Sequence, residues 1–241
     1  MKILDLEISD KTISFKKSVE SFFNRPIEIL VGEMSIGANE TYESSIIENT
    51  PRITIKRGEI INEEILVHEM WHLHMKGISG IYQISFGGQL IQTLLGKFKS
   101  DCLMTLLGKA HSIFQHKYFF NRMLEDGYYP SKYLIDAFYK VVEYYPNNIG
   151  YDCALLNHVS LDVVQFLNAI EENDVNANRI LNIIKDRNMP AFVLGSIIFK
   201  QLDTFSDPLQ EPELFSNFLK ILFEYKEPIN YSINNNECFF Y

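Results

Sequence analysis

The segment from Asn62 to Gly77 carries helix start and stop signals at its two ends. Asn62 is a good N-cap, and the acids Glu63 and Glu64 follow it at the positive end of the helix dipole. Lys76 and Gly77 are typical of a last helical turn and of the residue after it. The sequence therefore predicts a helix from Glu63 to Lys76, and the apolar residues around most of its surface predict that it is buried.

This predicted helix contains the motif HExxH, formed by His68, Glu69 and His72. Histidines four residues apart share one helix face, so their imidazoles can bind one Zn²⁺ ion. Glu69 lies beside that face, where it can take a proton from a metal-bound water without being a ligand. Burying three such side chains without a metal ion would be costly. We expect His68 and His72 as metal ligands and Glu69 as the catalytic base; the alternative is a helix with two ordinary core histidines.

The segment from Arg52 to Gly77 resembles the zincin metallopeptidases, because the strand-like sequence RITIKR is followed by the HExxH helix in NEEILVHEMWHLHMKG. The resemblance implies that the helix follows the edge strand of a small sheet and that the substrate backbone pairs with that strand. The glycine and third histidine of the metzincin extension are missing after His72. The likeness is therefore to gluzincin-like proteins, which take their third zinc ligand from a later helix.

The candidate for the third ligand is His116, in a long predicted helix over Asp101–Glu125 that would pack beside the HExxH helix. Spacing alone leaves four alternatives open, of which the first could instead be an electrophile: His111, Glu125, Asp101 and His158. His74 is no strong candidate, because it lies about 200° around the helix from His72. Tyr128 and Tyr129 could donate a hydrogen bond to the oxyanion of the scissile carbonyl, although packing is their better default.

The fold expected from the rest of the chain is α+β, with a small N-terminal sheet on the HExxH helix and a mainly helical C-terminal half. Strands are expected at Lys2–Ile8, Ile27–Val31 and Arg52–Arg57, a helix capped by Ser14 at Phe15–Phe23, and a long loop at Gly32–Thr50. Further helices are expected at Ser131–Tyr145, Asp152–Asn173, Ala177–Arg187, Ala191–Asp203 and Pro212–Tyr225. The tail Ile229–Tyr241 is expected to be loosely packed. We expect a zincin-like region over residues 1–130 and a helical region over 131–241 packed on it, or one continuous domain.

The charge balance argues against nucleic acid and anionic membranes as partners. Lys and Arg number 22 against 31 Asp and Glu, a net charge of −9, and the basic residues are scattered. No apolar stretch reaches the about 18 residues of a membrane span, and the N-terminus is no secretory signal. Cys102, Cys153 and Cys238 form no CxxC pair, so we expect reduced thiols in a cytoplasmic protein.

The function expected from these observations is that of an intracellular zinc metallopeptidase, a hydrolase of peptide or protein substrates that uses Zn²⁺ as its cofactor. The metal ligands would be His68, His72 and His116, and Glu69 would activate the water. One alternative is a non-catalytic binding or regulatory module with a zincin-like fold and structural zinc. Another is a zinc hydrolase of a non-peptide amide. The oligomeric state is left open.

Overall fold

The computed structural model describes residues 2–3, 6–32, 42–59, 61–79, 83–130, 134, 142, 153–169, 175–202, 211–234 and 237–241. These ranges contain helices and small sheets, so the chain is an α+β protein, as the sequence predicted. It folds as two compact units, Met1–Gly80 and Ile81–Tyr241. The long helix before residue 130 packs on helices of the second unit.

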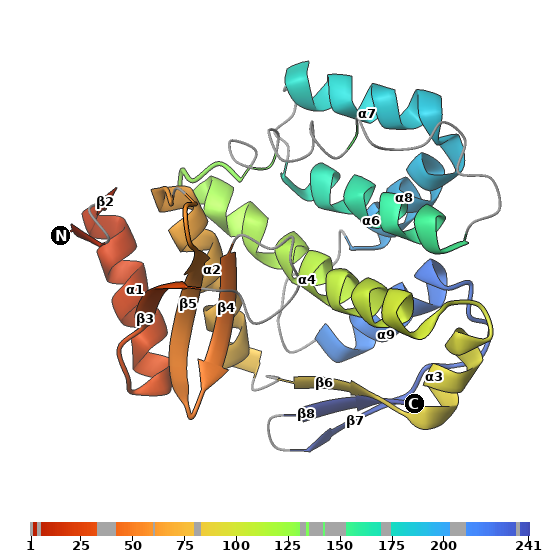
Figure 1. Cartoon of the computed structure of the whole chain (residues 1–241), viewed down its shortest axis with the longest axis horizontal. Coiled ribbons are helices and arrows are strands. Elements are labelled where there is room, and N and C mark those ends of the chain that lie inside the picture. The colour runs from red at the N-terminus through yellow and green to blue at the C-terminus, as the bar shows by residue number, and fades with distance from the viewer. Residues whose placement is uncertain are drawn as a thin grey trace. The chain divides into compact units, whose positions relative to one another are not determined.

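The first unit combines two long helices with a mixed three-stranded sheet (Figure 1). The helices are α1 (Asp10–Phe23) and α2 (Glu63–Ser79), and the strands are β3 (Glu28–Gly32), β4 (Tyr42–Ile47) and β5 (Thr50–Lys56). A separate antiparallel pair, β1 (Lys2–Ile3) and β2 (Leu6–Glu7), replaces the single strand expected at Lys2–Ile8. Helix α2 packs on α1 and on strands β4 and β5, so the sheet supports the helix that carries HExxH.

Strand β5 lies in the middle of this sheet, between β3 and β4. It pairs in parallel with β3 and antiparallel with β4, whose register runs from Tyr42↔Ile55 to Ile47↔Thr50. The expectation that Arg52–Arg57 is an edge strand is therefore wrong, because part of the expected loop forms β4. A tight turn at Glu48 and Asn49, both at positive φ, connects β4 to β5. Residues 33–41 of the expected loop lie outside the described residues.

Helix α1 begins at Asp10, five residues before the predicted start. Ser9 is its N-cap and accepts a hydrogen bond from the backbone N–H of Thr12 at 3.2 Å, so the predicted cap at Ser14 is wrong. The rings of Phe15 and Trp71 lie 4.8 Å apart and pack α1 against α2.

Helix α2 continues through Gly77 to Ser79, although Gly77 was expected to end it. A Cβ atom at Gly77 would lie only 3.0 Å from the Cβ of Phe22 in α1. The glycine therefore serves close helix packing and not a left-handed cap.

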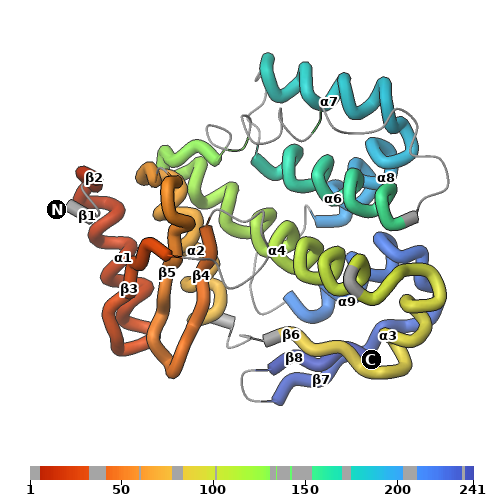
Figure 2. The backbone as a smooth tube through the Cα atoms, viewed as in Figure 1, coloured from red at the N-terminus to blue at the C-terminus, as the bar shows by residue number. Residues whose placement is uncertain are grey.

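The second unit contains six further helices in its described ranges (Figure 2). They are α3 (Gly88–Leu95), α4 (Ser100–Glu125), α6 (Cys153–Ala169), α7 (Val175–Arg187), α8 (Met189–Gln201) and α9 (Glu211–Leu222). Five of them confirm predicted helices, and α3 lies in a stretch where no element was predicted. Of the expected helix at Ser131–Tyr145 only Leu134 and Val142 are described, and both are helical; the rest lies outside the described residues.

A second three-stranded sheet forms from segments far apart in the sequence. Strand β8 (Glu237–Phe240) lies between β6 (Gln83–Phe86), with which it is parallel, and β7 (Tyr231–Asn234), with which it is antiparallel. Cys238 and Phe240 of β8 are buried. The expectation of a loosely packed tail is therefore wrong, because β6 supplies a partner that the local sequence of the tail does not reveal.

The core of the second unit lies among its helices. Val159, Val163 and Phe166 of α6 are fully buried against α7 and α8. A Cβ atom at Gly195 of α8 would lie 2.6 Å from the backbone oxygen of Ser160, so only glycine permits this approach to α6. The apolar side of α9 and the residue after its end are also buried in this unit: Phe215, Phe218, Leu219 and Phe223.

Candidate metal site

Helix α2 holds the HExxH residues on a rigid, well-anchored element. Asn62 Oδ1 accepts a hydrogen bond from the backbone N–H of Ile65 at 2.8 Å, which confirms the predicted N-cap. Leu66, Met70 and Leu73 are fully buried and fix the other faces of the helix. Side chains on such an element are positioned more accurately than side chains on loops.

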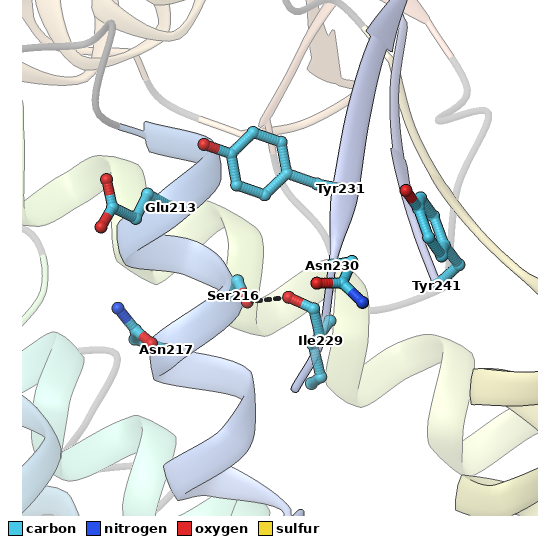
Figure 3. A pocket seen from close by; sticks show the side chains of 7 residues that line it. All are labelled: Glu213, Ser216, Asn217, Ile229, Asn230, Tyr231 and Tyr241. Atoms are coloured by element: carbon cyan, nitrogen blue, oxygen red, sulfur yellow. Dashed lines mark hydrogen bonds between the residues drawn. The ribbon is translucent and has the colours of Figure 1, made fainter. Parts of the chain in front are cut away.

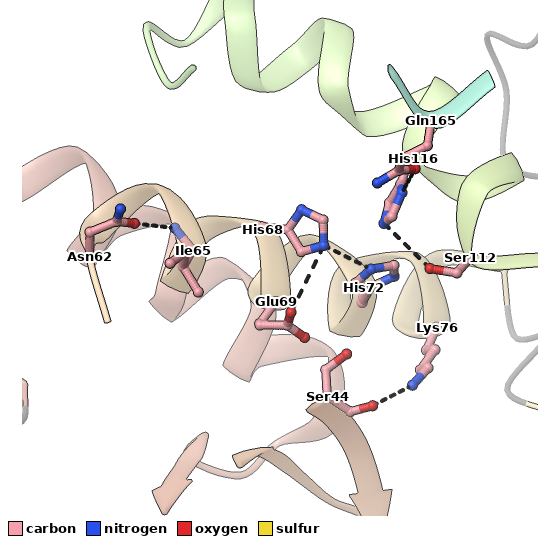
Figure 4. Close-up of polar contacts among 10 residues, drawn as sticks. All are labelled: Ser44, Asn62, Ile65, His68, Glu69, His72, Lys76, Ser112, His116 and Gln165. Atoms are coloured by element: carbon pink, nitrogen blue, oxygen red, sulfur yellow. Dashed lines mark hydrogen bonds and ion pairs between the residues drawn. The ribbon is translucent and has the colours of Figure 1, made fainter. Parts of the chain in front are cut away.

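His68 and His72 lie on one face of α2, with their Nε2 atoms 3.2 Å apart (Figure 4). Their rings meet edge to face, with centroids 4.9 Å apart, and His68 is buried. Two nitrogens bound to one tetrahedral zinc ion at about 2.1 Å are about 3.4 Å apart. The observed spacing therefore suits a single ion shared by both imidazoles.

Glu69 is buried next to the two histidines. Its Oε1 atom lies 3.9 Å from the Nε2 atom of His68 (Figure 4). A carboxylate at this distance is close enough to take a proton from a water molecule held near the imidazole nitrogens. The spacing agrees with the role that HExxH predicts for this residue.

Tyr42 of β4 lies on the side of the sheet that faces the helices. It is directly opposite the buried Ile55, and opposite residues of an antiparallel pair share one face. Burial, together with the negative charges of Glu59 and Glu69, raises the pKa of Tyr42, so its phenol keeps its proton at neutral pH. Tyr42 falls in the stretch that was expected to be a loop, so it was not predicted as a site residue.

Lys76 lies one turn beyond His72 on α2 and connects the helix to β4. Its Nζ atom donates a hydrogen bond to the backbone oxygen of Ser44 at 3.0 Å. Burial lowers the pKa of Lys76, while the charges of Glu69 and Glu43 act in the opposite direction. Lys76 was expected only as the cation of the last helical turn, although its i+4 spacing from His72 indicated the same helix face.

His116 is buried in α4 of the second unit, and its ring stacks on Phe120 with centroids 4.7 Å apart. Its Nδ1 atom contacts Oε1 of Gln165, and its Nε2 atom lies 3.4 Å from Ser112 Oγ (Figure 4). Burial lowers the pKa of His116 to about 4, against the opposing effect of the Gln165 hydrogen bond. The ring is therefore neutral at pH 7. When His116 Nδ1–H donates to the Gln165 oxygen, its Nε2 atom carries the lone pair that could bind a metal ion.

Among the described residues, His68, His72 and His116 form the one group of three His, Cys, Asp or Glu side chains that could hold a metal ion. These are the three ligands named from the sequence. Imidazole nitrogens suit zinc, copper, iron and nickel, whereas calcium and magnesium prefer oxygen ligands. The donor set therefore fits a transition metal and is compatible with zinc.

The other ligand candidates from the sequence do not belong to this group. His111 pairs with Glu211 through an Nε2–Oε1 distance of 2.7 Å, and His158 Nε2 lies 3.9 Å from Cys102 Sγ. Glu125 is exposed at the end of α4. The side chain of Asp101 lies outside the described residues.

Three further residues singled out in the sequence lie outside this group of histidines. His74 faces the rings of Phe15 and Phe22, with centroid distances of 5.5 and 5.1 Å, which agrees with its expected direction away from His72. Tyr128 is buried after the end of α4, and its neighbour Tyr129 is exposed.

A separate polar pocket of about 320 Å³ lies in the second unit, between α9 and the C-terminal segment (Figure 3). Its lining residues are Glu213, Ser216, Asn217, Ile229, Asn230, Tyr231 and Tyr241. The Ser216 hydroxyl donates a hydrogen bond to the backbone oxygen of Ile229 and closes one side. Glu213 is the one ionisable carboxylate of the lining, and no histidine or cysteine contributes to it. The pocket therefore lacks the donors of the histidine group.

Comparisons with protein-family models, with curated proteins and with solved structures gave no match. Within the described ranges, no helix combines the length and the apolar character needed to cross a membrane. The function proposed below therefore depends on the residues and geometry of this chain.

Proposed function

We propose that this chain is a zinc-dependent metallopeptidase in which His68, His72 and His116 bind the ion and Glu69 is the catalytic base. The observation that carries the proposal is the 3.2 Å spacing of the His68 and His72 Nε2 atoms, with the Glu69 carboxylate 3.9 Å from the first of them. Three protein ligands leave the fourth position of a tetrahedral zinc ion open, as in catalytic sites.

Glu69 moves the proton that the reaction requires. A zinc ion bound by the three histidines would supply a Lewis acid that polarises the peptide carbonyl and lowers the pKa of water to about 7. The Glu69 carboxylate accepts a proton from the attacking water as its oxygen bonds to the carbonyl carbon. Glu69 then delivers this proton to the departing amine nitrogen as the C–N bond breaks, so Glu69 ends the cycle ionised.

The substrate strand in this proposal pairs with β4. The sequence favoured Arg52–Arg57 as the pairing strand, but β5 already has a partner on each side. Strand β4 is at the edge of the described sheet and packs on α2, the helix that carries Glu69. An extended peptide added to β4 gains main-chain hydrogen bonds without any demand on its side chains.

Metal content is the first test of the proposal. Purified protein should contain about one zinc ion per chain by elemental mass spectrometry, and His72→Ala should lose it. His74→Phe is the matched control on the same helix, because a phenyl ring fits among Phe15, Phe22 and Trp71. It should retain the zinc. A wild-type protein that binds no zinc after reconstitution near pH 7 would contradict the proposal.

Turnover separates the peptidase from a module with structural zinc. Glu69→Gln keeps the shape of the side chain but removes the base, so it should keep the zinc and lose at least about 100-fold in peptide hydrolysis. Equal turnover by wild type and Glu69→Gln would rule out Glu69 as the base. Hydrolysis of small amides but of no peptide would instead favour a non-peptide amide hydrolase.

A further inference from the structure

Lys76 ties the HExxH helix to the outer strand of the sheet by a bond to the strand backbone. Its Nζ atom lies 3.0 Å from the carbonyl oxygen of Ser44 (Figure 4). Ser44 is in the interior of β4, opposite Ile53 of the central strand. Because the acceptor is a main-chain atom, this bond joins the helix directly to the backbone of the strand.

The surroundings of this lysine are buried but carry opposite charge. Burial lowers the pKa of Lys76, and the carboxylates of Glu69 and Glu43 oppose that shift without reversing it. A hydrogen bond from a charged donor to a carbonyl is stronger and more directional than a neutral one. The Lys76 side chain therefore interacts electrostatically with Glu69 and forms a hydrogen bond with the β4 backbone.

The position of Lys76 on α2 relates the strand to the site. Lys76 is four residues after His72 and eight after His68, so the three lie along one side of the helix. A shift of β4 along α2 would change the register between a peptide bound to β4 and Glu69. Displacements of about 1 Å are enough to cost an enzyme about 100-fold in rate.

We propose that Lys76 is a positioning residue that holds β4 in register with the HExxH helix, so that a peptide paired with β4 presents its scissile bond to Glu69. This inference rests on the proposed function, because it assigns β4 as the substrate strand. It goes further in naming extended peptides as the substrate class: a peptide that spans several residues of β4 depends on Lys76, and a very short one does not.

The test compares long and short peptides in zinc-loaded, full-length protein. The probes are a mixture of quenched-fluorescent octapeptides and a mixture of the corresponding tripeptides. In Lys76→Met, we expect the ratio of kcat/KM for octapeptides to that for tripeptides to fall about tenfold, mainly through a rise in KM. Lys76→Arg keeps a cationic donor and should restore most of the ratio.

Hydrogen exchange gives a second measurement that does not depend on activity. In zinc-loaded Lys76→Met, the amides of Tyr42–Ile47 should exchange faster, while those in the first half of α2 should be unchanged. Lys97→Met is the matched control, because Lys97 Nζ also donates to a backbone oxygen, that of Phe223 at 3.1 Å, but in the second unit. It should change neither the peptide ratio nor the exchange of β4.

Each outcome decides between the two proposals. If the wild-type protein binds zinc but hydrolyses no peptide, the proposed function fails and this inference fails with it. If the wild-type protein is active and Lys76→Met retains the peptide ratio, this inference alone is wrong. If Lys76→Met does not fold, Lys76→Gln replaces it, because its side chain is one atom shorter and carries no ammonium, which weakens the bond to Ser44; an unchanged ratio in that variant also overturns the inference.

Discussion

Ser9 and Glu63 join the first turns of the two helices in the first unit. The backbone N–H and the hydroxyl of Ser9 donate to Glu63 Oε1 at 2.8 and 2.7 Å, and the Thr12 hydroxyl donates to the same oxygen. Ser9 also caps α1, and Glu63 is the first residue of α2. One carboxylate therefore fixes where the HExxH helix begins relative to its neighbour.

This carboxylate makes the first unit sensitive to acid. Burial opposes the charge on Glu63, but the hydrogen bonds from Ser9 and Thr12 outweigh it and lower the pKa of Glu63 below its ordinary value of 4.5. A lowered pKa in the folded state stabilises it above the unfolded pKa, and this stabilisation is lost as pH falls through the folded pKa. Wild type should therefore exceed Glu63→Gln in unfolding free energy by about 1 kcal/mol at pH 7, and the difference should shrink below about pH 4.5.

The fluorescence of Trp71 during urea unfolding measures this effect. Trp71 is the single tryptophan of the chain and packs on Phe15 of α1, so it reports on the first unit. Glu48→Gln, at an exposed turn position, is the control and should track wild type at every pH. A Glu63→Gln difference that stays constant down to pH 3 would contradict the prediction.

Two helical glycines should respond in opposite ways to alanine. At Gly77 a new Cβ meets the Cβ of Phe22 at 3.0 Å, so Gly77→Ala should destabilise by about 1–2 kcal/mol despite its better helix propensity. Nothing lies within 4 Å of a Cβ at Gly108, inside α4, so Gly108→Ala should stabilise by up to about 1 kcal/mol. Chemical unfolding followed by circular dichroism compares the two, and stabilisation by both would show that α1 can move away from α2.

The stability of the fold around the buried Glu211 carboxylate should depend strongly on its contact with His111. Glu211 is only 1% exposed, its Oε1 atom lies 2.7 Å from His111 Nε2, and Gln115 donates to the same oxygen at 3.1 Å. His111→Leu leaves a buried carboxylate without its main partner, which should cost about 3 kcal/mol of unfolding free energy. The double variant His111→Leu/Glu211→Gln should recover part of that loss, and strict additivity in a double-mutant cycle would refute the coupling.

Gln165 should tune zinc affinity without being a ligand. It holds the Nδ1 side of His116 and so leaves Nε2 for the metal ion in the proposed site. Gln165→Leu should weaken zinc binding by about 10–100-fold, measured by competition with a chelating dye. Gln115→Leu, one residue before His116, is the control, because its amide contacts His111 and Glu211 instead. Equal affinity in wild type and Gln165→Leu would argue against His116 as a ligand.

The helices were predictable where their signals are local. Asn62 caps α2 as its sequence indicates, and α4 ends before Gly127, whose φ of +79° suits glycine. Strand β4 was not predictable in this way, since its turn places Glu48 at a positive φ that glutamate seldom adopts. Strand β8 depends on a partner far away in the chain. Local patterns thus identified most helices but only part of the sheets.

The residues of the candidate site also fall into two groups, those that local spacing predicts and those that only tertiary contacts reveal. His68, Glu69 and His72 follow from helix periodicity alone, and His116 followed from the search for a later helical histidine. Tyr42, Lys76 and Gln165 could not be found so directly, because their importance depends on which strand or helix lies opposite them. Residues that support a site through tertiary contacts leave no fixed spacing in the sequence.

The parallel pairing of β6 with β8 has a consequence for how the second unit forms. Ser85 and Glu237, whose side chains share a hydrogen bond in this pair, are 152 residues apart in the chain. Closing so large a loop is entropically unfavourable until the intervening helices have condensed and shortened it. We therefore expect the strand pair to form late, on helices that are already assembled. Once formed, the pair joins two segments from opposite ends of the second unit, and hydrogen exchange of its amides measures how often this closure opens.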